Sequence, residues 1–316
     1  MELPVYQDII NAHRLIRDYI HCTPVMTSSA INLITGSEIF FKCENLQKTG
    51  AFKFRGACNA VFSLTDELAA RGVGTHSSGN HAAALALAAR MRGIEAQIVM
   101  PSNAPDIKKK AVQGYGGIIT YCEPTLQSRE NTLMEIAERT GIVIVHPYNN
   151  CNVIAGQGTA AKELLEEVPF LNLVMCPVGG GGLLSGTALS VKAVTPSCRV
   201  IAAEPAGADD AWRSFKAGYI IPSDHPKTIA DGLLTSLGEI NYGVISQKVD
   251  DIITVSEESI INAMRLIWER MKLIIEPSSA VPLAALLENK DTFRDLRVGI
   301  ILSGGNVDLG NLPFSR

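Results

Sequence analysis

The stretch "LNLVMCPVGGGGLLSG", residues 171–186, contains the pattern that decides the fold. Its first half is a nearly continuous apolar run, which is typical of a strand buried on both faces. Four consecutive glycines follow, and after them the apolar spacing becomes helical. A buried strand that passes through a glycine loop into a helix is the building unit of α/β folds.

The same alternation extends along the chain. Further strands are predicted at 39–44, 95–101, 117–123, 141–147, 198–205, 250–256 and 297–305. Helical patterns lie between them, for example at 80–93 and at 128–141, where the second begins Ser-x-x-Asn and both end in glycine. We therefore expect an α/β fold with parallel sheets covered on both faces. Three strand–helix units in 72–149 predict a smaller α/β domain, inserted between the two parts of a large domain, 1–71 and 150–316.

Composition excludes several classes of protein. The 316 residues are 47% hydrophobic and 19% charged, which is ordinary for a folded enzyme and argues against disorder. The net charge is −4 and no basic run exceeds "KKK" at 108–110, so nothing favours binding to nucleic acid. No apolar run approaches the roughly 18 residues of a membrane span.

The N-terminus and the cysteines predict the cellular location of the protein. The first residues, "MELPVYQDII", lack the pattern of a secretory signal. The seven cysteines are scattered and form no CxxC pair, which argues against a disulfide framework or a zinc site. We expect a cytoplasmic protein with reduced thiols.

Lys53 stands between Phe52 and Phe54 in "ENLQKTGAFKFRGA", residues 44–57. A lysine in apolar surroundings loses its proton more readily, and a neutral amine can attack a carbonyl. The alternative is an ordinary exposed lysine at the start of a helix.

Glycines 179–182 follow a predicted strand and precede a predicted helix. Consecutive glycines can present several N–H groups to one anion, and the helix dipole favours negative charge there, so a phosphate is the expected ligand. No Walker lysine follows and the spacing is not GxGxxG. The alternative is a flexible turn.

Two other strand ends carry polar side chains. In "THSSGNHAA", residues 75–83, the polar side chains either bind a ligand or cap the next helix; they are Ser77, Ser78, Asn80 and His81. In "ILSGGNVD", Ser303 is placed to serve a ring nitrogen or to satisfy the backbone. A phosphate cup, a reactive lysine, an asparagine and a serine together suit pyridoxal 5′-phosphate, with Lys53 as the Schiff-base lysine.

From about Tyr6 to Asp308 the chain resembles the fold-type II pyridoxal-phosphate enzymes, which have the tryptophan synthase β-like fold. The resemblance rests on "KTGAFKFRGA", "THSSGNH", "VIAGQGT", "PVGGGGLLSG" and "SGGNVD" in that order, and it is strongest for the serine racemase and serine/threonine dehydratase group. It implies an active site in the cleft between the two domains. It also implies cofactor contacts from Phe52, Lys53, Asn80, Gly179, Gly180, Gly181, Gly182, Leu183 and Ser303.

The resemblance implies α,β-elimination of water from L-serine or L-threonine, which gives a keto acid and ammonia. Lys53 would act as base on one face of the substrate, and Ser78 matches the second acid/base of serine racemases, so racemase activity is also expected. Ser77, Ser78, His81 and Arg129 are the candidate substrate residues.

Two alternatives remain open. If Arg129 faces the pocket it can hold a second carboxylate, which favours L-threo-3-hydroxyaspartate ammonia-lyase activity; otherwise it is a solvated arginine in a surface helix. The non-enzyme alternative is a metabolite-binding protein that retains only the phosphate cup.

Further sites are implied by the same resemblance. "AAEPAGADD" matches a divalent-metal loop with Glu204, Ala208 and Asp210 as ligands for Mg²⁺, or for Ca²⁺ or Mn²⁺. ATP would bind between the subunits of a homodimer, at Ser28, Ser29, Lys48, Thr49, Tyr115, Lys272 and Asn306. Ala83 stands where the nucleotide-activated relatives carry glutamine, which weakens the expectation of ATP binding.

Overall fold

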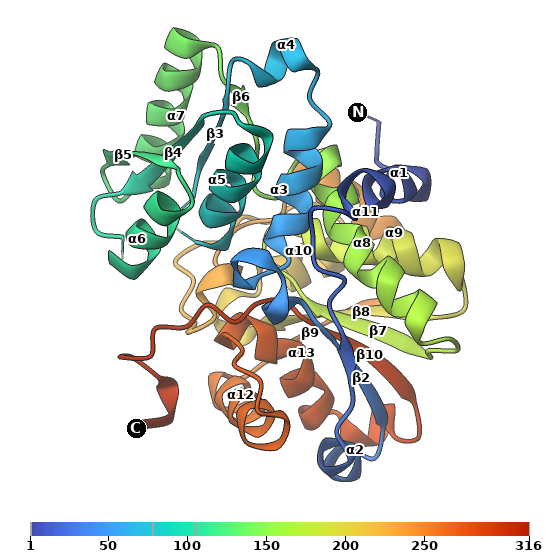
Figure 1. Ribbon diagram of the computed structural model, residues 1–316. Helices are drawn as coiled ribbons and strands as arrows, with labels where there is room; N and C mark the ends of the chain where they lie inside the picture. The colour runs from blue at the N-terminus through green and yellow to red at the C-terminus, as the bar shows by residue number, and fades with distance from the viewer. Residues whose placement is uncertain (1, 78, 105, 316) are drawn as a thin grey trace.

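A computed structural model describes residues 2–77, 79–104 and 106–315, and it contains two separate sheets (Figure 1). The larger sheet has the strand order β1-β2-β10-β7-β8-β9. Its strands are β1 (Val25–Met26), β2 (Glu38–Cys43), β10 (Arg297–Leu302), β7 (Leu173–Pro177), β8 (Arg199–Pro205) and β9 (Asp251–Val255). All neighbours are parallel except β1, which pairs antiparallel with β2.

The smaller sheet is built from one continuous part of the chain. Its order is β5-β4-β3-β6, and all of its pairs are parallel. The strands are β3 (Val73–His76), β4 (Ala96–Pro101), β5 (Ile118–Cys122) and β6 (Val143–Ile144). The domain boundaries at 72 and 149 stay a prediction, with which the position of this sheet in the chain agrees.

Helices cover both faces of each sheet. They are α1 (Tyr6–Ile16), α2 (Ser29–Thr35), α3 (Lys53–Phe62), α4 (Asp66–Ala69), α5 (Asn80–Arg92), α6 (Asp106–Gly114), α7 (Leu126–Thr140), α8 (Cys151–Glu167), α9 (Gly182–Val194), α10 (Asp210–Ala217), α11 (Glu239–Lys248), α12 (Glu257–Met271), α13 (Pro277–Glu288) and α14 (Lys290–Phe293). Short 3₁₀ turns lie at η1 (Glu44–Leu46), η2 (Lys48–Gly50), η3 (Ala206–Ala208), η4 (Asp231–Leu233) and η5 (Pro313–Ser315).

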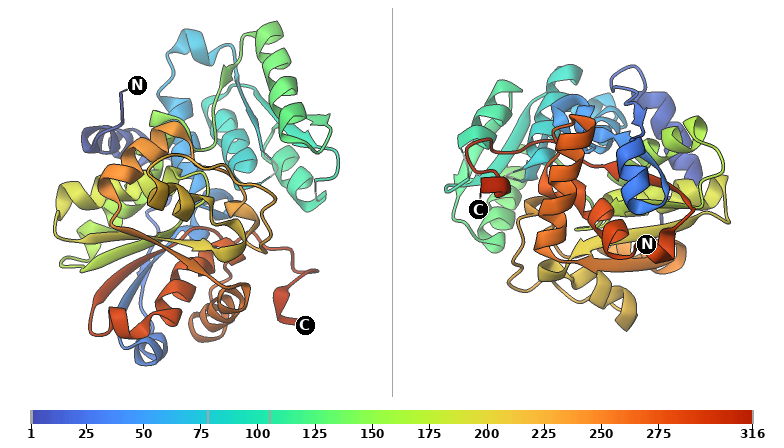
Figure 2. Two further views of the ribbon diagram at one scale, coloured as in Figure 1. Left: turned by 180° about the vertical axis from the view of Figure 1, so that it is seen from behind. Right: turned by 90° about the horizontal axis from the view of Figure 1, so that it is seen from below.

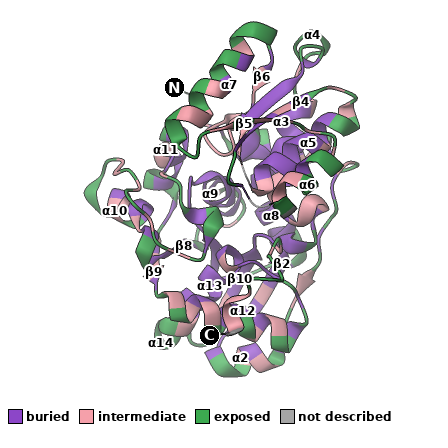
Figure 3. Ribbon diagram, turned by 90° about the vertical axis from the view of Figure 1, so that its left-hand side faces the viewer, coloured by how far each residue is buried: buried purple, intermediate pink, exposed green. Residues whose placement is uncertain are grey.

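The alternation of side chains along each strand explains these layers. In β7, Leu173 and Met175 pack in the cluster formed with α12 and α13, whereas Val174 and Cys176 pack with α8 and α9 on the other face. Strands β7, β8 and β10 are therefore buried along almost their whole length, as the purple of β10 in Figure 3 indicates. Strands β1, β5 and β9 keep partly exposed residues. The prediction of an α/β fold with covered parallel sheets is confirmed, apart from the antiparallel β1.

The sequence predictions need correction at several elements. Strands β1 and β3 were not predicted, because β1 is two residues long and β3 is a short "VGTH" without an apolar run. The strand predicted at 141–147 contains only the two residues of β6. Helix α7 begins at Leu126 and not at Ser128, because the Thr125 hydroxyl accepts a hydrogen bond from the Ser128 N–H and caps the helix.

The two sheets lie on either side of a central group of helices. Helix α3 packs against α5 of the smaller sheet and against α8 of the larger one, so it connects the two halves of the molecule (Figures 1 and 2). The carboxyl ends of β2, β10 and β7 all lead into segments that surround the start of α3. In the described part of the chain, no helix is long and apolar enough to cross a membrane.

Candidate active site

Lys53 is the first residue of α3, and the end of β10 holds it in place. The Phe52 N–H donates to the Ser303 carbonyl at 3.0 Å, and Ala51 pairs with Gly304 in an antiparallel bridge. Ser303 is itself buried. Two segments that are far apart in the sequence therefore bring the predicted Schiff-base lysine beside the predicted ring-nitrogen partner, at the carboxyl end of the sheet.

The Lys53 amine has few polar neighbours. Its Nζ donates to the Pro147 carbonyl at 2.9 Å and lies 5.1 Å from the Phe52 ring and 5.9 Å from the Tyr148 ring. Burial lowers the Lys53 pKa to about 8, although the Glu276 carboxylate opposes part of the shift. An amine of this kind is partly neutral near physiological pH and can act as nucleophile or base.

The glycine loop forms the N-terminus of α9. Gly181 has φ +90, and among the described residues no side chain caps α9, so its first N–H groups are available to a ligand. A Cβ on Gly180 would lie 2.4 Å from the Tyr148 ring, and one on Gly182 would lie 2.5 Å from Gln157 Oε1. Glycine is required at these positions because other segments approach the loop so closely.

Gln157 belongs to the stretch "VIAGQGT", and the sequence alone indicates no role for it. It is fully buried on α8, and neither polar atom of its side chain has a partner among the residues that the structure describes. A buried amide without partners beside a glycine loop fits a site that holds a polar ligand. The uncapped helix, the glycine loop and the partly neutral amine together fit an aldehyde that carries a phosphate.

Asn80 starts α5 and lies beside the same site. Its Nδ2 donates to both carboxylate oxygens of Glu276, at 3.0 and 3.1 Å, and its Oδ1 accepts from Asn306 Nδ2 at 2.9 Å. Sequence reasoning missed Glu276, which no motif marks. Burial raises the Glu276 pKa to about 7, so this carboxyl changes charge near neutral pH beside Asn80 and Lys53.

The predicted substrate residues surround the start of α5. The Ser77 hydroxyl accepts from the Gly79 N–H at 3.3 Å, and His81 Nε2 lies 3.2 Å from the Val145 carbonyl. Burial first and then the nearby Lys53 charge lower the His81 pKa to about 3, so His81 is neutral. Ser78 lies outside the described residues.

Arg129 lies on α7, half-buried. Burial lowers the pKa of His76, and the Arg129 charge lowers it further. The His76 ring is 6.2 Å from that of His146, which in turn is 4.6 Å from the Tyr148 ring. The Arg129 charge therefore acts on His76, while Arg129 Nε itself donates to the Thr125 carbonyl, one turn earlier, at 3.4 Å.

The predicted metal ligands lie around η3. Glu204 at the end of β8 accepts from the Ala211 and Trp212 N–H groups at 3.0 and 2.8 Å, and both oxygens of Asp210 are buried without a partner among the described residues. Burial raises the Glu204 pKa to about 9 and the Asp210 pKa to about 6. Unpartnered carboxylate oxygens fit a hard divalent cation. The described ranges contain no group of three His, Cys, Asp or Glu side chains placed to hold a metal, so a cation here needs backbone or water ligands as well.

Three of the predicted nucleotide residues share a cavity of about 370 Å³ beside Asn80: Thr49, Tyr115 and Asn306. Ser28, Ser29, Lys48 and Lys272 are not among its lining residues. Lys48 Nζ donates instead to the Tyr19 carbonyl at 2.5 Å, and Lys272 Nζ to the Glu269 carbonyl at 2.6 Å.

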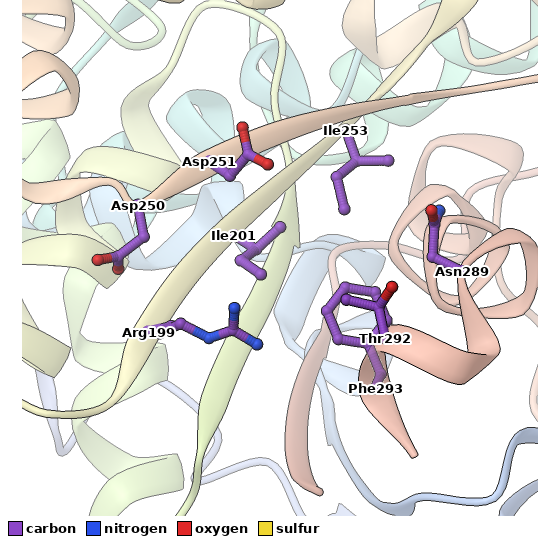
Figure 4. Close-up of a pocket in the computed structure, with 8 residues that line it drawn as sticks. All are labelled: Arg199, Ile201, Asp250, Asp251, Ile253, Asn289, Thr292 and Phe293. Carbon is purple, nitrogen blue, oxygen red and sulfur yellow. The ribbon is translucent and has the colours of Figure 1, made fainter.

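A separate cavity, also of about 370 Å³, lies at the amino ends of β8 and β9, between Arg199 and Phe293 (Figure 4). Asp250 and Asp251 on its wall pair with Lys192 and Lys216 at 2.7 and 3.1 Å. None of the predicted site residues lines it. The site therefore belongs to the carboxyl ends of the strands and not to this cavity.

Comparison with known proteins agrees with this geometry. The family model described as "Pyridoxal-phosphate dependent enzyme" matches residues 16–304. The chain is 54% identical over 315 residues to a β-hydroxyaspartate dehydratase of Paracoccus denitrificans, covering 100% of both chains. It is 51% identical to the crystal structure of serine racemase from Dictyostelium discoideum, with a TM-score of 0.93 and coverage of 97% and 99%.

A more distant solved structure has the same architecture. It is a threonine deaminase from T.th. that is 42% identical, has a TM-score of 0.92, and covers 97% of this chain and 99% of its own. The family match spans both sheets, Lys53, the glycine loop and Ser303. The chain belongs to the pyridoxal-phosphate-dependent enzymes of fold type II.

Proposed function

We propose that this enzyme removes water from small β-hydroxy amino acids by α,β-elimination, and that water then hydrolyses the released enamine, through its imine, to a keto acid and ammonia. The observation that carries the proposal is the Lys53 amine, whose pKa burial lowers to about 8. A base must be partly neutral at working pH to accept the α-proton of an amino acid.

Each residue has a distinct part in this reaction. The bound cofactor supplies an aldehyde and an electron-withdrawing ring that stabilises negative charge at the substrate's α-carbon. The N–H groups of the glycine loop would bind its phosphate, and the uncharged Ser303 hydroxyl would pair with its ring nitrogen. Asn80 would serve its phenolic oxygen, and Lys53 Nζ would hold the α-proton after it has left the substrate.

Racemisation is the second activity that we infer. It requires an acid/base group on the face opposite Lys53, and Ser78 is the residue that we assign to that role from the sequence. Relatives described as serine racemases, such as that of Dictyostelium discoideum at 51% identity, support this assignment.

The choice of substrate depends on Arg129. Its charge acts on His76, whose ring lies 6.2 Å from that of His146, and we propose that this cation receives a second carboxylate on the substrate. The relative described as β-hydroxyaspartate dehydratase supports 3-hydroxyaspartate as the second candidate substrate.

The test is to supply the purified protein with L-serine or with L-threo-3-hydroxyaspartate and to quantify pyruvate, oxaloacetate and D-serine. We expect keto acid from at least one substrate, and D-serine if Ser78 acts as proposed. Lys53→Ala should lose the visible absorption band of the cofactor and nearly all turnover. Arg129→Met should lower kcat/KM for 3-hydroxyaspartate and leave that for serine nearly unchanged.

The outcomes separate the alternatives. Full turnover by Lys53→Ala would exclude the proposed mechanism. A native protein that binds pyridoxal 5′-phosphate but turns over neither substrate would favour the metabolite-binding alternative. Equal effects of Arg129→Met on both substrates would exclude its role in recognising a second carboxylate.

We also propose a divalent cation, Mg²⁺ first, at Glu204, Asp210 and the Ala208 carbonyl. The buried, unpartnered oxygens of Asp210 support it. Millimolar Mg²⁺ added after chelation should raise the melting temperature of the native protein and leave that of Asp210→Asn unchanged. Equal melting temperatures of the native protein with and without the cation would contradict the site.

Two further proposals concern assembly. The chain forms a homodimer, and ATP binds at the cavity lined by Thr49, Tyr115 and Asn306. Sedimentation of the native protein with and without ATP, together with the ATP dependence of turnover, tests both. A monomeric protein whose turnover rate does not change with ATP would exclude both the homodimer and the ATP site.

A further inference from the structure

Asn241 on α11 is a fully buried polar residue that faces the glycine loop. A Cβ on Gly181 would lie 2.8 Å from the Cβ of Asn241, so the two segments are in direct contact. Its Oδ1 accepts from the Ser185 hydroxyl at 3.4 Å, while its Nδ2 faces two carbonyl oxygens. This is the orientation of the amide that gives both of its ends a suitable partner.

The first of these carbonyls belongs to the glycine loop. Asn241 Nδ2 donates to the Gly180 carbonyl at 2.6 Å, and the Gly238 N–H donates to the same oxygen at 3.2 Å. In a planar trans peptide the carbonyl and the following N–H point in opposite directions. A Gly180 carbonyl fixed toward α11 therefore turns the Gly181 N–H toward the other side of the loop.

The second carbonyl belongs to the segment that contacts Lys53. Asn241 Nδ2 also lies 3.2 Å from the Tyr148 carbonyl, and the Ile240 N–H donates to Asn149 Oδ1 at 3.0 Å. The carbonyl of the preceding residue, Pro147, accepts the hydrogen bond of Lys53 Nζ. The start of α11 thus holds the glycine loop and the Pro147–Asn149 segment together.

We propose that Asn241 is a positioning residue for the cofactor: it sets the direction of the Gly181 N–H and the distance between the phosphate loop and the Lys53 amine. The proposal rests on the assignment of pyridoxal 5′-phosphate to this site. Asn241 touches neither phosphate nor amine in this arrangement; it acts through Gly180 and Tyr148.

The test compares two ligands that differ only in the phosphate. Apoprotein is titrated with pyridoxal 5′-phosphate and with pyridoxal, and the dissociation constants are measured by absorbance and by quenching of intrinsic fluorescence. For Asn241→Leu we expect a roughly 10- to 100-fold loss of affinity for pyridoxal 5′-phosphate. This is the effect of losing one good hydrogen bond to an anion, here the bond from the Gly181 N–H to the phosphate. Affinity for pyridoxal should change less than about threefold, which is close to the experimental scatter.

The matched control is Asn289→Leu. Asn289 Nδ2 also donates to a backbone carbonyl, that of Ala285 at 2.9 Å, but it lies beside the cavity at the amino ends of β8 and β9. This variant should bind both ligands as the native protein does. Asn241→Ala adds no atoms to the site and replaces Asn241→Leu if the leucine variant melts below the assay temperature.

Two results would overturn the proposal. One is native affinity for pyridoxal 5′-phosphate in a folded Asn241 variant. The other is an equal loss of affinity for both ligands, which would indicate general loosening of the site. Failure of the native apoprotein to bind pyridoxal 5′-phosphate would instead contradict the cofactor assignment itself.

Discussion

At the level of single residues, the site depends on how far the protein shifts the pKa values of its side chains. Lys53 is the main case, because burial lowers its pKa from 10.5 to about 8. At pH 7 about one such amine in ten is neutral, against roughly one in three thousand for an unperturbed lysine. The nearby Glu276 carboxylate limits this shift, so the two groups set the reactivity together.

This shift predicts the pH dependence of cofactor capture. The rate at which apoprotein captures pyridoxal 5′-phosphate should rise with pH and level off above about 8, because the neutral amine is the reactive form. Stopped-flow absorbance from about pH 6 to about pH 10 measures it. Glu276→Gln removes the negative charge that favours the protonated amine. The midpoint of the pH dependence in this variant should therefore lie at a lower pH than in the native protein. A native midpoint near 10.5, the ordinary lysine value, would contradict the lowered pKa.

At the level of elements, the close crossing of α8 and α9 sets the position of the glycine loop at the start of α9. A Cβ on Gly186 would lie 2.5 Å from the Gly158 nitrogen and 2.7 Å from the Ile154 carbonyl oxygen. These are backbone atoms that cannot rotate away. The glycine pair therefore lets α9 pack directly on α8, and the loop at the start of α9 takes its position from that contact.

Gly186→Ala should push α9 away from α8 and displace the glycine loop. We expect a loss of about 1–3 kcal/mol in the free energy of unfolding and weaker binding of pyridoxal 5′-phosphate. Thermal melting with and without the cofactor measures both effects. Gly114→Ala is the control, because a Cβ there meets nothing within 4 Å and the change should cost less than about 0.5 kcal/mol. Similar losses in the two variants would mean that the helix crossing does not place the loop.

At the level of the whole molecule, a buried charge cluster joins β2, α3 and α8. Arg55 Nε lies 2.7 Å from Glu44 Oε2, and its Nη2 lies 2.7 Å from Glu163 Oε2, which Lys42 Nζ also reaches at 2.7 Å. Arg55, Glu44 and Lys42 are fully buried. Charges so far from water must be paired, so each partner depends on the others.

Removing one member of this cluster should destabilise the whole fold. Arg55→Met leaves Glu44 without its cation, and we expect a loss of about 3–5 kcal/mol in urea unfolding at neutral pH. The control is Arg71→Met, which breaks the exposed pair with Glu67 at 2.9 Å and should cost no more than about 1 kcal/mol. A small effect of Arg55→Met would show that the remaining charges rearrange or take up water.

The sequence by itself determined the fold class and the positions of most strands along the chain, and it marked the glycine loop and Lys53 as candidates for the site. These features depend on local patterns: apolar runs, consecutive glycines and a lysine between two phenylalanines. Periodicity could not reveal β3, because "VGTH" is short and half polar, nor the true start of α7 at Leu126, two residues before the predicted Ser128.

Only the tertiary structure decided which distant residues complete the site. Glu276, Gln157 and Asn241 belong to no ligand-binding pattern, and their roles arise because α13, α8 and α11 meet the ends of β10 and β7. The lowered pKa of Lys53 likewise comes from the segments that pack around its amine. Burial and contact between distant parts of the sequence are properties of the packed chain, and no local stretch of sequence contains them.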